Sequence, residues 1–134
     1  MSFIHGKDTY FSLGGVDLSA YTNTSTFTRG ADVHDLTTYG KSDHVNAGGL
    51  LTSAMSAGGT YDNTASTGPR GAIEPLIGTT VTMIRRPEGT GSGKPQDSVS
   101  VVVGTYVETN PVADYVQWSV ELTGSDAVTS TTQP

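Results

Sequence analysis

Residues 88–95 form the segment whose residue types come nearest to a chemical site. Its glycines and Lys94 resemble a phosphate-binding loop, in which backbone N–H groups surround phosphate oxygens. That motif needs Gly where Glu88 stands, Ser or Thr where Pro95 stands, and a helix directly after it. Here a candidate strand follows instead. We therefore expect a flexible hairpin linker and no nucleotide site.

Two pairs of neighbours, His34-Asp35 and Asp43-His44, could suggest acid–base or metal chemistry. Adjacent residues of a strand point to opposite faces, so neither imidazole is oriented by its neighbour. With His5 they make three scattered histidines without the ligand spacing of a zinc site. The serines lack a nucleophile elbow, and the aspartates do not form a calcium loop. We expect no enzyme activity, no cofactor and no metal.

Positive charge is concentrated only around Arg85-Arg86, with Arg70 and Lys94 nearby. Two interpretations stay open: salt bridges from Arg70, Arg85 and Arg86 to an acidic loop of a neighbouring subunit, or a solvated strand end, since exposed pairs contribute little. Seven Lys plus Arg against thirteen Asp plus Glu give a net charge of −6. A protein that reads a nucleic-acid sequence normally carries a basic face, so that function is disfavoured.

The elements that must position these residues belong to one domain of 134 residues. Only 34% of the chain is hydrophobic and 15% is charged, and Gly occurs seventeen times. Such a chain has a thin core and is either partly disordered or completes its burial against copies of itself. The lack of Cys excludes disulfides. The first residues have no signal-peptide core, and no apolar run could span a bilayer, so we expect a cytoplasmic product without a membrane partner.

Period-two alternation indicates a mainly β fold, a sandwich or small barrel. Strands are expected over residues 8–13, 22–29, 33–38, 50–61, 79–86, 98–109 and 115–123, with a tight turn at Gly14-Gly15. Residues 71–78 form the only candidate helix, limited to about two turns by Pro75. The expected core side chains share one face of their strands: Phe11, Phe27, Val116, Trp118, Val120 and Leu122.

Residues 39–49 break the alternation and predict a long loop. Eleven residues without structure are unusual in a compact domain, and such loops are commonly functional or ordered by a partner. The chain is further divided into an N-terminal arm, residues 1–7, and a polar C-terminal tail, residues 125–134. The loop residues of interest are Tyr39, Gly40, Lys41, Ser42, Asp43, His44, Val45, Asn46, Gly48 and Gly49.

The order of these segments resembles the tail tube (major tail) proteins of long-tailed, non-contractile phages. The resemblance covers residues 6–126, and the shared order and spacing of the motifs make it specific. The motifs are Gly6-Lys7-Asp8-Thr9, residues 16–21, Arg29-Gly30-Ala31-Asp32, residues 35–40, residues 71–78, Arg86-Pro87-Glu88-Gly89, Gly93-Lys94-Pro95, and the last hairpin, residues 107–124, with its turn Pro111-Val112-Ala113-Asp114.

The resemblance implies a tail-tube fold of two packed β-sheets flanked by a short helix. It implies homohexameric rings whose strands join into one β-barrel around a lumen. Rings stack through the long loop and through arms that include Phe3, Ile4 and His5. On this resemblance we expect a tube that is assembled in the bacterial cytoplasm, is located in the virion tail, holds a tape-measure protein and conducts double-stranded DNA into the host without sequence-specific binding. Tail terminator and baseplate or tip proteins are further partners.

Other functions stay open beside this one. An immunoglobulin-like adhesion or decoration module of a virion has a similar strand content, but such a module is self-sufficient as a monomer and lacks a long loop with two arms. A tail terminator or a contractile-tail tube would share the fold. An enzyme would need a pocket with converging groups of perturbed pKa, and the sequence indicates none.

Overall fold

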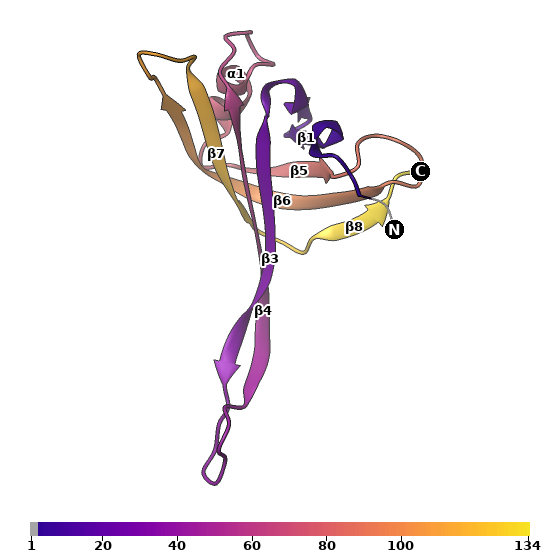
Figure 1. Cartoon of the computed structure of the whole chain (residues 1–134), viewed down its shortest axis with the longest axis vertical. Helices are drawn as coiled ribbons and strands as arrows, with labels where there is room; N and C mark the ends of the chain where they lie inside the picture. The colour runs from indigo at the N-terminus through magenta and orange to yellow at the C-terminus, as the bar shows by residue number, and fades with distance from the viewer. Residues whose placement is uncertain (1–2) are drawn as a thin grey trace.

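The chain is an antiparallel β protein with one short α-helix, as expected from the sequence. The computed structural model describes residues 3–134, and no helix among them is long and apolar enough to cross a membrane. Figure 1 shows the elements, which in chain order are η1 (Gly6–Asp8), β1 (Tyr10–Leu13), β2 (Val16–Asp17), η2 (Ser19–Tyr21), β3 (Thr24–Asp35), β4 (Asn46–Thr60), α1 (Pro69–Ile73), η3 (Glu74–Leu76), β5 (Thr80–Arg86), β6 (Pro95–Thr109), β7 (Gln117–Gly124) and β8 (Thr129–Thr132).

The two expected layers are parts of one continuous sheet. Its strand order is β2-β1-β5-β6-β7-β4-β3, and β8 adds to β6. Strand β6 joins the layers because it is 15 residues long. Its first part pairs with β5 and β8, and its second part pairs with β7.

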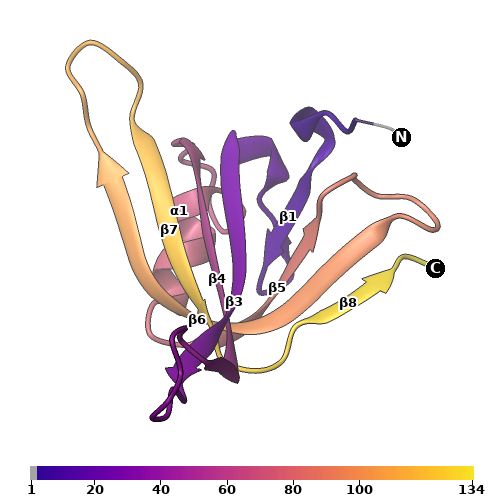
Figure 2. The ribbon, with the colours of Figure 1, turned by 60° about the horizontal axis from the view of Figure 1, so that its bottom comes forward.

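The sheet curls back on itself, which brings distant strands together (Figure 2). The guanidinium carbon of Arg85 in β5 lies 5.4 Å from the ring centroid of Phe27 in β3. Arg29 of β3 donates a hydrogen bond of 3.2 Å to the hydroxyl of Ser130 in β8. Strand β3 is the last strand of the path, so these contacts place it over the opposite layer.

The core lies between the two layers and consists mainly of aliphatic side chains from β1, β4, β5, β6 and β7. Trp118 is buried at one end of it, and its indole N–H donates to the Tyr21 carbonyl at 3.1 Å, so its polar atom is satisfied. Of the core residues that the sequence suggests, Phe11, Trp118, Val120 and Leu122 are buried, and Phe27 and Val116 are half-buried.

Local sequence explains the first turn and the helix. Gly14 and Gly15 both have positive φ, 60° and 87°, as a type I′ hairpin turn requires, so the expected tight turn is confirmed. Helix α1 begins at Pro69, two residues before the expected start, because proline fits the first helical turn. Pro75 has no N–H to continue the α-helical pattern, and the chain goes on as the short 3-10 helix η3.

Strand β4 begins at Asn46, so the expected loop over residues 39–49 is too long at its end. Gly48 and Gly49 lie within the strand. A β-bulge between the Ala31 and Val33 pairs falls beside them, and a Cβ at Gly49 would lie 2.5 Å from His34 Nε2. Gly49 therefore leaves room for the His34 side chain beside the bulge, and the loop between the two strands covers only residues 36–45.

The C-terminal segment is not a free polar tail, contrary to the expectation for residues 125–134. Strand β8 pairs with β6, and Gln133 is only 7% exposed. The Gln133 side chain donates to the Gly89 carbonyl at 2.8 Å and accepts from the Gly91 N–H at 3.0 Å. The glycine-rich loop that resembles a phosphate-binding motif therefore holds the chain's own end, so it is not a flexible linker.

We predict that Leu122→Ala lowers the free energy of unfolding by about 2–5 kcal/mol, because the side chain is buried and its loss leaves a cavity. Leu50→Ala is the matched control: Leu50 is exposed, and we expect a change within about 0.5 kcal/mol. Denaturant unfolding of dilute protein measures both. Equal effects of the two substitutions would contradict this placement of the core.

Candidate interaction surface

The β3–β4 hairpin projects from the body of the molecule (Figure 1). Strand β4 pairs with β7 only from Ala54 onward, so its residues before Ala54 pair with β3 alone. In the described part of the chain, β3 has no strand on its other edge. An isolated two-stranded hairpin is marginal in water, and free edges attract further strands. The hairpin therefore has the properties of an element that is completed by another chain.

The loop at the hairpin tip is ordered by Asp35 and Thr37. The Asp35 carboxylate accepts from the Thr37 N–H at 2.9 Å and from the Thr37 hydroxyl. That hydroxyl in turn accepts the Val45 N–H at 2.8 Å. These hydrogen bonds from Thr37 hold the pKa of Asp35 below its ordinary value. The loop therefore has a defined conformation that these hydrogen bonds maintain.

Apolar side chains gather on this hairpin in contact with water. Half of the exposed large hydrophobic residues that the structure describes belong to it, and Leu51 is 82% exposed. Exposed apolar patches of this kind mark interaction surfaces. The residues are Val33, Leu36, Tyr39, Val45, Leu50 and Leu51.

The sheet face behind the hairpin is different: it is polar, made of small side chains and almost uncharged. Phe27, Met55 and Leu122 point to the core, so the alternate residues of β3, β4, β7 and β6 point away from it. One register row across the four strands is Thr26, Ser56, Glu121 and Thr105, all exposed. Among the described residues of these strands, Glu121 is the only charged one on this face, whose other members are Thr24, Thr28, Ala54, Gly58, Thr60, Gln117, Ser119, Thr123, Val102, Val107 and Thr109.

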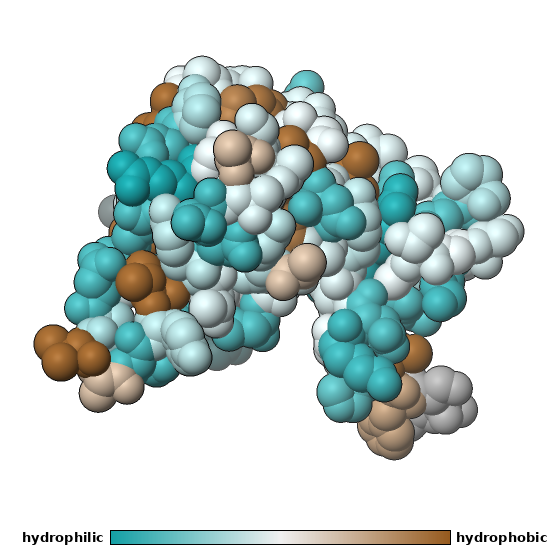
Figure 3. All heavy atoms as spheres, turned by 90° about the horizontal axis from the view of Figure 1, so that it is seen from above, coloured by the Kyte–Doolittle hydropathy of each residue, from teal (hydrophilic) through white to brown (hydrophobic). Residues whose placement is uncertain are grey.

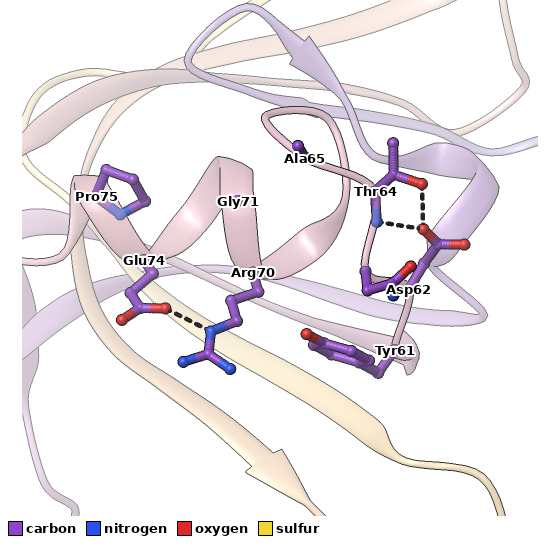
Figure 4. A pocket seen from close by; sticks show the side chains of 9 residues that line it. Tyr61, Asp62, Thr64, Ala65, Arg70, Gly71, Glu74 and Pro75 are labelled. Carbon is purple, nitrogen blue, oxygen red and sulfur yellow. Dashed lines mark hydrogen bonds and ion pairs between the residues drawn. The ribbon is translucent and has the colours of Figure 1, made fainter.

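A hollow of about 540 Å³ lies at the other end of the molecule, between α1 and the connection that follows β4 (Figure 4). Arg70 donates to Glu74 at 2.9 Å, and this hydrogen bond raises the pKa of Arg70. Asp62 accepts from the N–H and hydroxyl of Thr64, which lowers the pKa of Asp62. A carboxylate held ionised and a paired guanidinium are suited to binding contacts and unsuited to proton transfer at neutral pH.

The remaining candidate residues are exposed or have partners within the chain. Asp35 and His44 lie 3.6 Å apart across the hairpin loop, and both are exposed. Residues 3–134 hold no group of three or more metal-binding side chains. Arg85 pairs with Asp97 at 2.9 Å, and Arg86 lies over the Tyr10 ring and donates to Gln96. Both arginines therefore have partners within their own chain. In the N-terminal arm Phe3 is 93% exposed, and Ile4 and His5 are exposed beside it.

Sequence reasoning missed two features of this surface. The uncharged face depends on which strands are neighbours, so alternation within single strands does not reveal it. Gln133 becomes buried only because a distant loop surrounds it. The exposed tip, by contrast, has a local signal, the loop-forming residues after Tyr39.

Solved structures resemble the whole chain. A chain of the native gene transfer agent (GTA) virion matches with a TM-score of 0.79 and 12% identity, over 96% of this chain and 99% of that one. A chain of the tail of the empty GTA particle, solved with C6 symmetry, matches with 0.75 and 13%, over 96% and 99%. A chain of the SPP1 tail tube matches with 0.78 and 13%, over 98% and 80%. No family model and no curated protein matches the sequence.

These likenesses extend over nearly the full chain, and at such low identity they show the fold. The chain has the tail-tube fold, which confirms the fold that the sequence resemblance implies.

We predict that Thr37→Val loosens the hairpin tip without destabilising the core. The pKa of Asp35 should rise toward its ordinary value, and the Val45 amide should exchange faster, because both lose the Thr37 hydroxyl. A lowered carboxylate pKa stabilises the folded form above the ordinary pKa, and this contribution is lost as pH falls through the native pKa. In the unchanged chain the tip should therefore loosen in acid. NMR titration and amide exchange measure these effects.

Thr64→Val is the matched control, since Thr64 binds Asp62 in the same Asp-x-Thr arrangement at the opposite end. It should raise the pKa of Asp62 and leave Val45 exchange unchanged. If both variants alter Val45 exchange alike, the local role of Thr37 is wrong.

Proposed function

We propose that this chain is the repeating structural subunit of a phage tail tube and has no enzymatic role. Homohexameric rings stack into a hollow tube that holds a tape-measure protein and conducts DNA into the host cell. The observation that carries the proposal is the projecting hairpin, an apolar element with free edges that finds no partner in its own chain among the described residues. The tail-tube fold and the C6 symmetry of the GTA tail support it.

Ring closure has a specific route in this sheet. The four strands β6, β7, β4 and β3 are consecutive and antiparallel. Within residues 3–134, β3 has a free edge on one side, and the part of β6 after Gly104 pairs only with β7. When β3 of one copy lies beside β6 of the next, the pair is again antiparallel. Six such sheets would close into a barrel without edges, which removes the hazard of open strands.

The polar face of this sheet would line the bore. Small hydroxyl side chains leave the bore wide, and Glu121 repels a passing polyanion without sequence-specific contact. The core side of the same strands is covered by β1, β5 and the first part of β6, which places the second layer outside. Lumen and outer wall are therefore distinct surfaces of one subunit.

A tube has two ends, and each end would be bound by a different protein. Besides other copies of itself and the tape-measure protein, the subunit would contact a tail terminator at one end and a baseplate or tip at the other. Its location is the virion tail, with assembly in the host cytoplasm.

Electron microscopy of concentrated protein tests the proposal: rings or hollow tubes support it. Monodisperse monomers would favour the self-sufficient adhesion or decoration module instead.

We predict that replacing residues 36–45 by Asn-Gly abolishes tube formation and leaves the subunit folded. Asp35 and Asn46 are register partners, so a two-residue turn can join them. The variant should keep its circular dichroism and melting temperature because the core is unchanged, and it should elute as monomers or single rings because the edges of β3 and β6 remain. Thr82→Ala, on exposed β5 surface, is the control and should assemble. Normal tubes from the shortened hairpin would remove the stacking role from the tip.

If the polar face lines the bore, a thiol placed on that face should be protected from large reagents in the assembled tube. The chain has no Cys, so Ser119→Cys on the polar face and Thr82→Cys on β5 each introduce a single thiol. In long tubes we expect Ser119→Cys to react with a small maleimide but resist a bulky polymer maleimide, which cannot enter the bore. Thr82→Cys should react with both reagents, and dilute monomers of either variant should too. Equal polymer labelling of the two variants in tubes would place the polar face outside.

A further inference from the structure

The exposed apolar side chains lie mainly at two opposite ends of the molecule. One end is the β3–β4 hairpin. The other is the turn between β6 and β7, where Val112 is fully exposed and Tyr115 is 78% exposed. Figure 1 shows this turn and α1 at the end of the body away from the hairpin tip. A single chain cannot bring these two surfaces together, but consecutive copies related by a shift along the long axis can.

The end opposite the hairpin is a hollowed surface. The hollow between α1 and residues 61–65 adjoins the β6–β7 hairpin, because the Tyr61 N–H donates to the Val116 carbonyl at 2.8 Å and Arg70 lies 3.9 Å from Glu108. Figure 4 shows Tyr61, Arg70 and Glu74 along its wall. Figure 3, which looks onto this end, shows apolar side chains among hydrophilic and neutral ones. The hollow is therefore lined by groups that can make both apolar and charged contacts.

The charges of the two ends can pair. Lys41 is the only Lys or Arg between Arg29 and Arg70, and it stands in the tip loop with Asp43 nearby. The opposite end carries Arg70 among an excess of carboxylates: Asp62, Glu74, Glu108 and Asp114. Lys41 can meet the carboxylates while Asp43 meets Arg70. Both signs of charge on both surfaces fix orientation better than apolar contact alone.

The hairpin also has the reach that such a contact needs. The eight residues of β4 before Ala54 extend beyond the pairing with β7. At ~3.3 Å per residue they span roughly 26 Å. The ordered loop at their end then presents Tyr39, which is fully exposed in its own chain.

We propose that the hollow beside α1 and the adjoining β6–β7 turn of one copy form the receptor for the hairpin tip of a copy in the next ring. The inference rests on the proposed tube and adds the surface that receives the tip. It is a heterologous contact between unlike surfaces, which repeats without closing and so generates a filament. Ring closure by β3 and β6 and stacking by tip and hollow thus use separate parts of the subunit.

The experiment uses paired cysteines, since the chain has none of its own. Ser42→Cys marks the tip and keeps Tyr39 and Lys41. It is combined with Ala113→Cys in the β6–β7 turn or with Asn63→Cys at the hollow, both exposed positions. The control combines Ser42→Cys with Thr82→Cys on β5. Each full-length variant is assembled, checked by electron microscopy, treated with a short bis-maleimide and analysed on a denaturing gel.

We expect a ladder of cross-linked oligomers from the turn or hollow pair and only monomers and trace dimers from the control. Tubes that form normally but give a ladder only with Thr82→Cys, or with no pair, would overturn the receptor assignment and leave the tube intact. Failure of the unchanged chain to form any ring or tube would overturn the proposed function itself. A strong dimer band from Ser42→Cys alone, which carries one thiol per chain, would mean that two tips meet each other, which also contradicts the proposal.

Discussion

Unpaired backbone along strand edges is the constraint on which this structure depends. Strand β3 offers its outer N–H and C=O groups to whatever lies beside it, and β4 does the same before Ala54. The core cannot cover them, because its buried residues are few and lie between the two layers. A monomer would leave these groups to water. The proposed ring would pair them with the backbone groups of a neighbouring strand, so association would satisfy hydrogen bonds that folding leaves open.

The body itself is held together by contacts between elements that are distant in the sequence. Trp118, donating to Tyr21 and lying beside the Tyr106 ring, anchors β7 under the start of β3. Arg85, between Asp97 and Phe27, ties the opposite layer to β3. Gln133, the last residue but one, donates to the Gly89 carbonyl in the loop after β5. These contacts lie away from the hairpin tip, so the body is held by its own contacts while the tip is left free for the proposed association.

Much of the fold could be predicted from the sequence, and the features that could not be predicted have a common cause. The alternation of Trp118, Val120 and Leu122 gave a buried strand face, and Gly14-Gly15 gave a turn, because both depend on local geometry. Strand β8, rich in Thr and Ser, exists only through its partner in β6, and Gly48-Gly49 enter a strand only because β3 and His34 lie beside them. The tip was visible as a loop, whereas the polar face appears only once four strands are placed side by side.

The hairpin has a consequence for the dimensions of any assembly built from it. Its two strands pair in antiparallel register on both sides of the bulge between Ala31 and Val33, so in the proposed tube its length would act as a spacer between layers of subunits. Side chains alternate along a strand, and a single inserted residue would turn Leu50 and Leu51 to the wrong sides. Where the strands pair regularly, a change of length that keeps both faces alters both strands together, by two residues at a time. The pitch of such a filament would then evolve in discrete steps of about 7 Å.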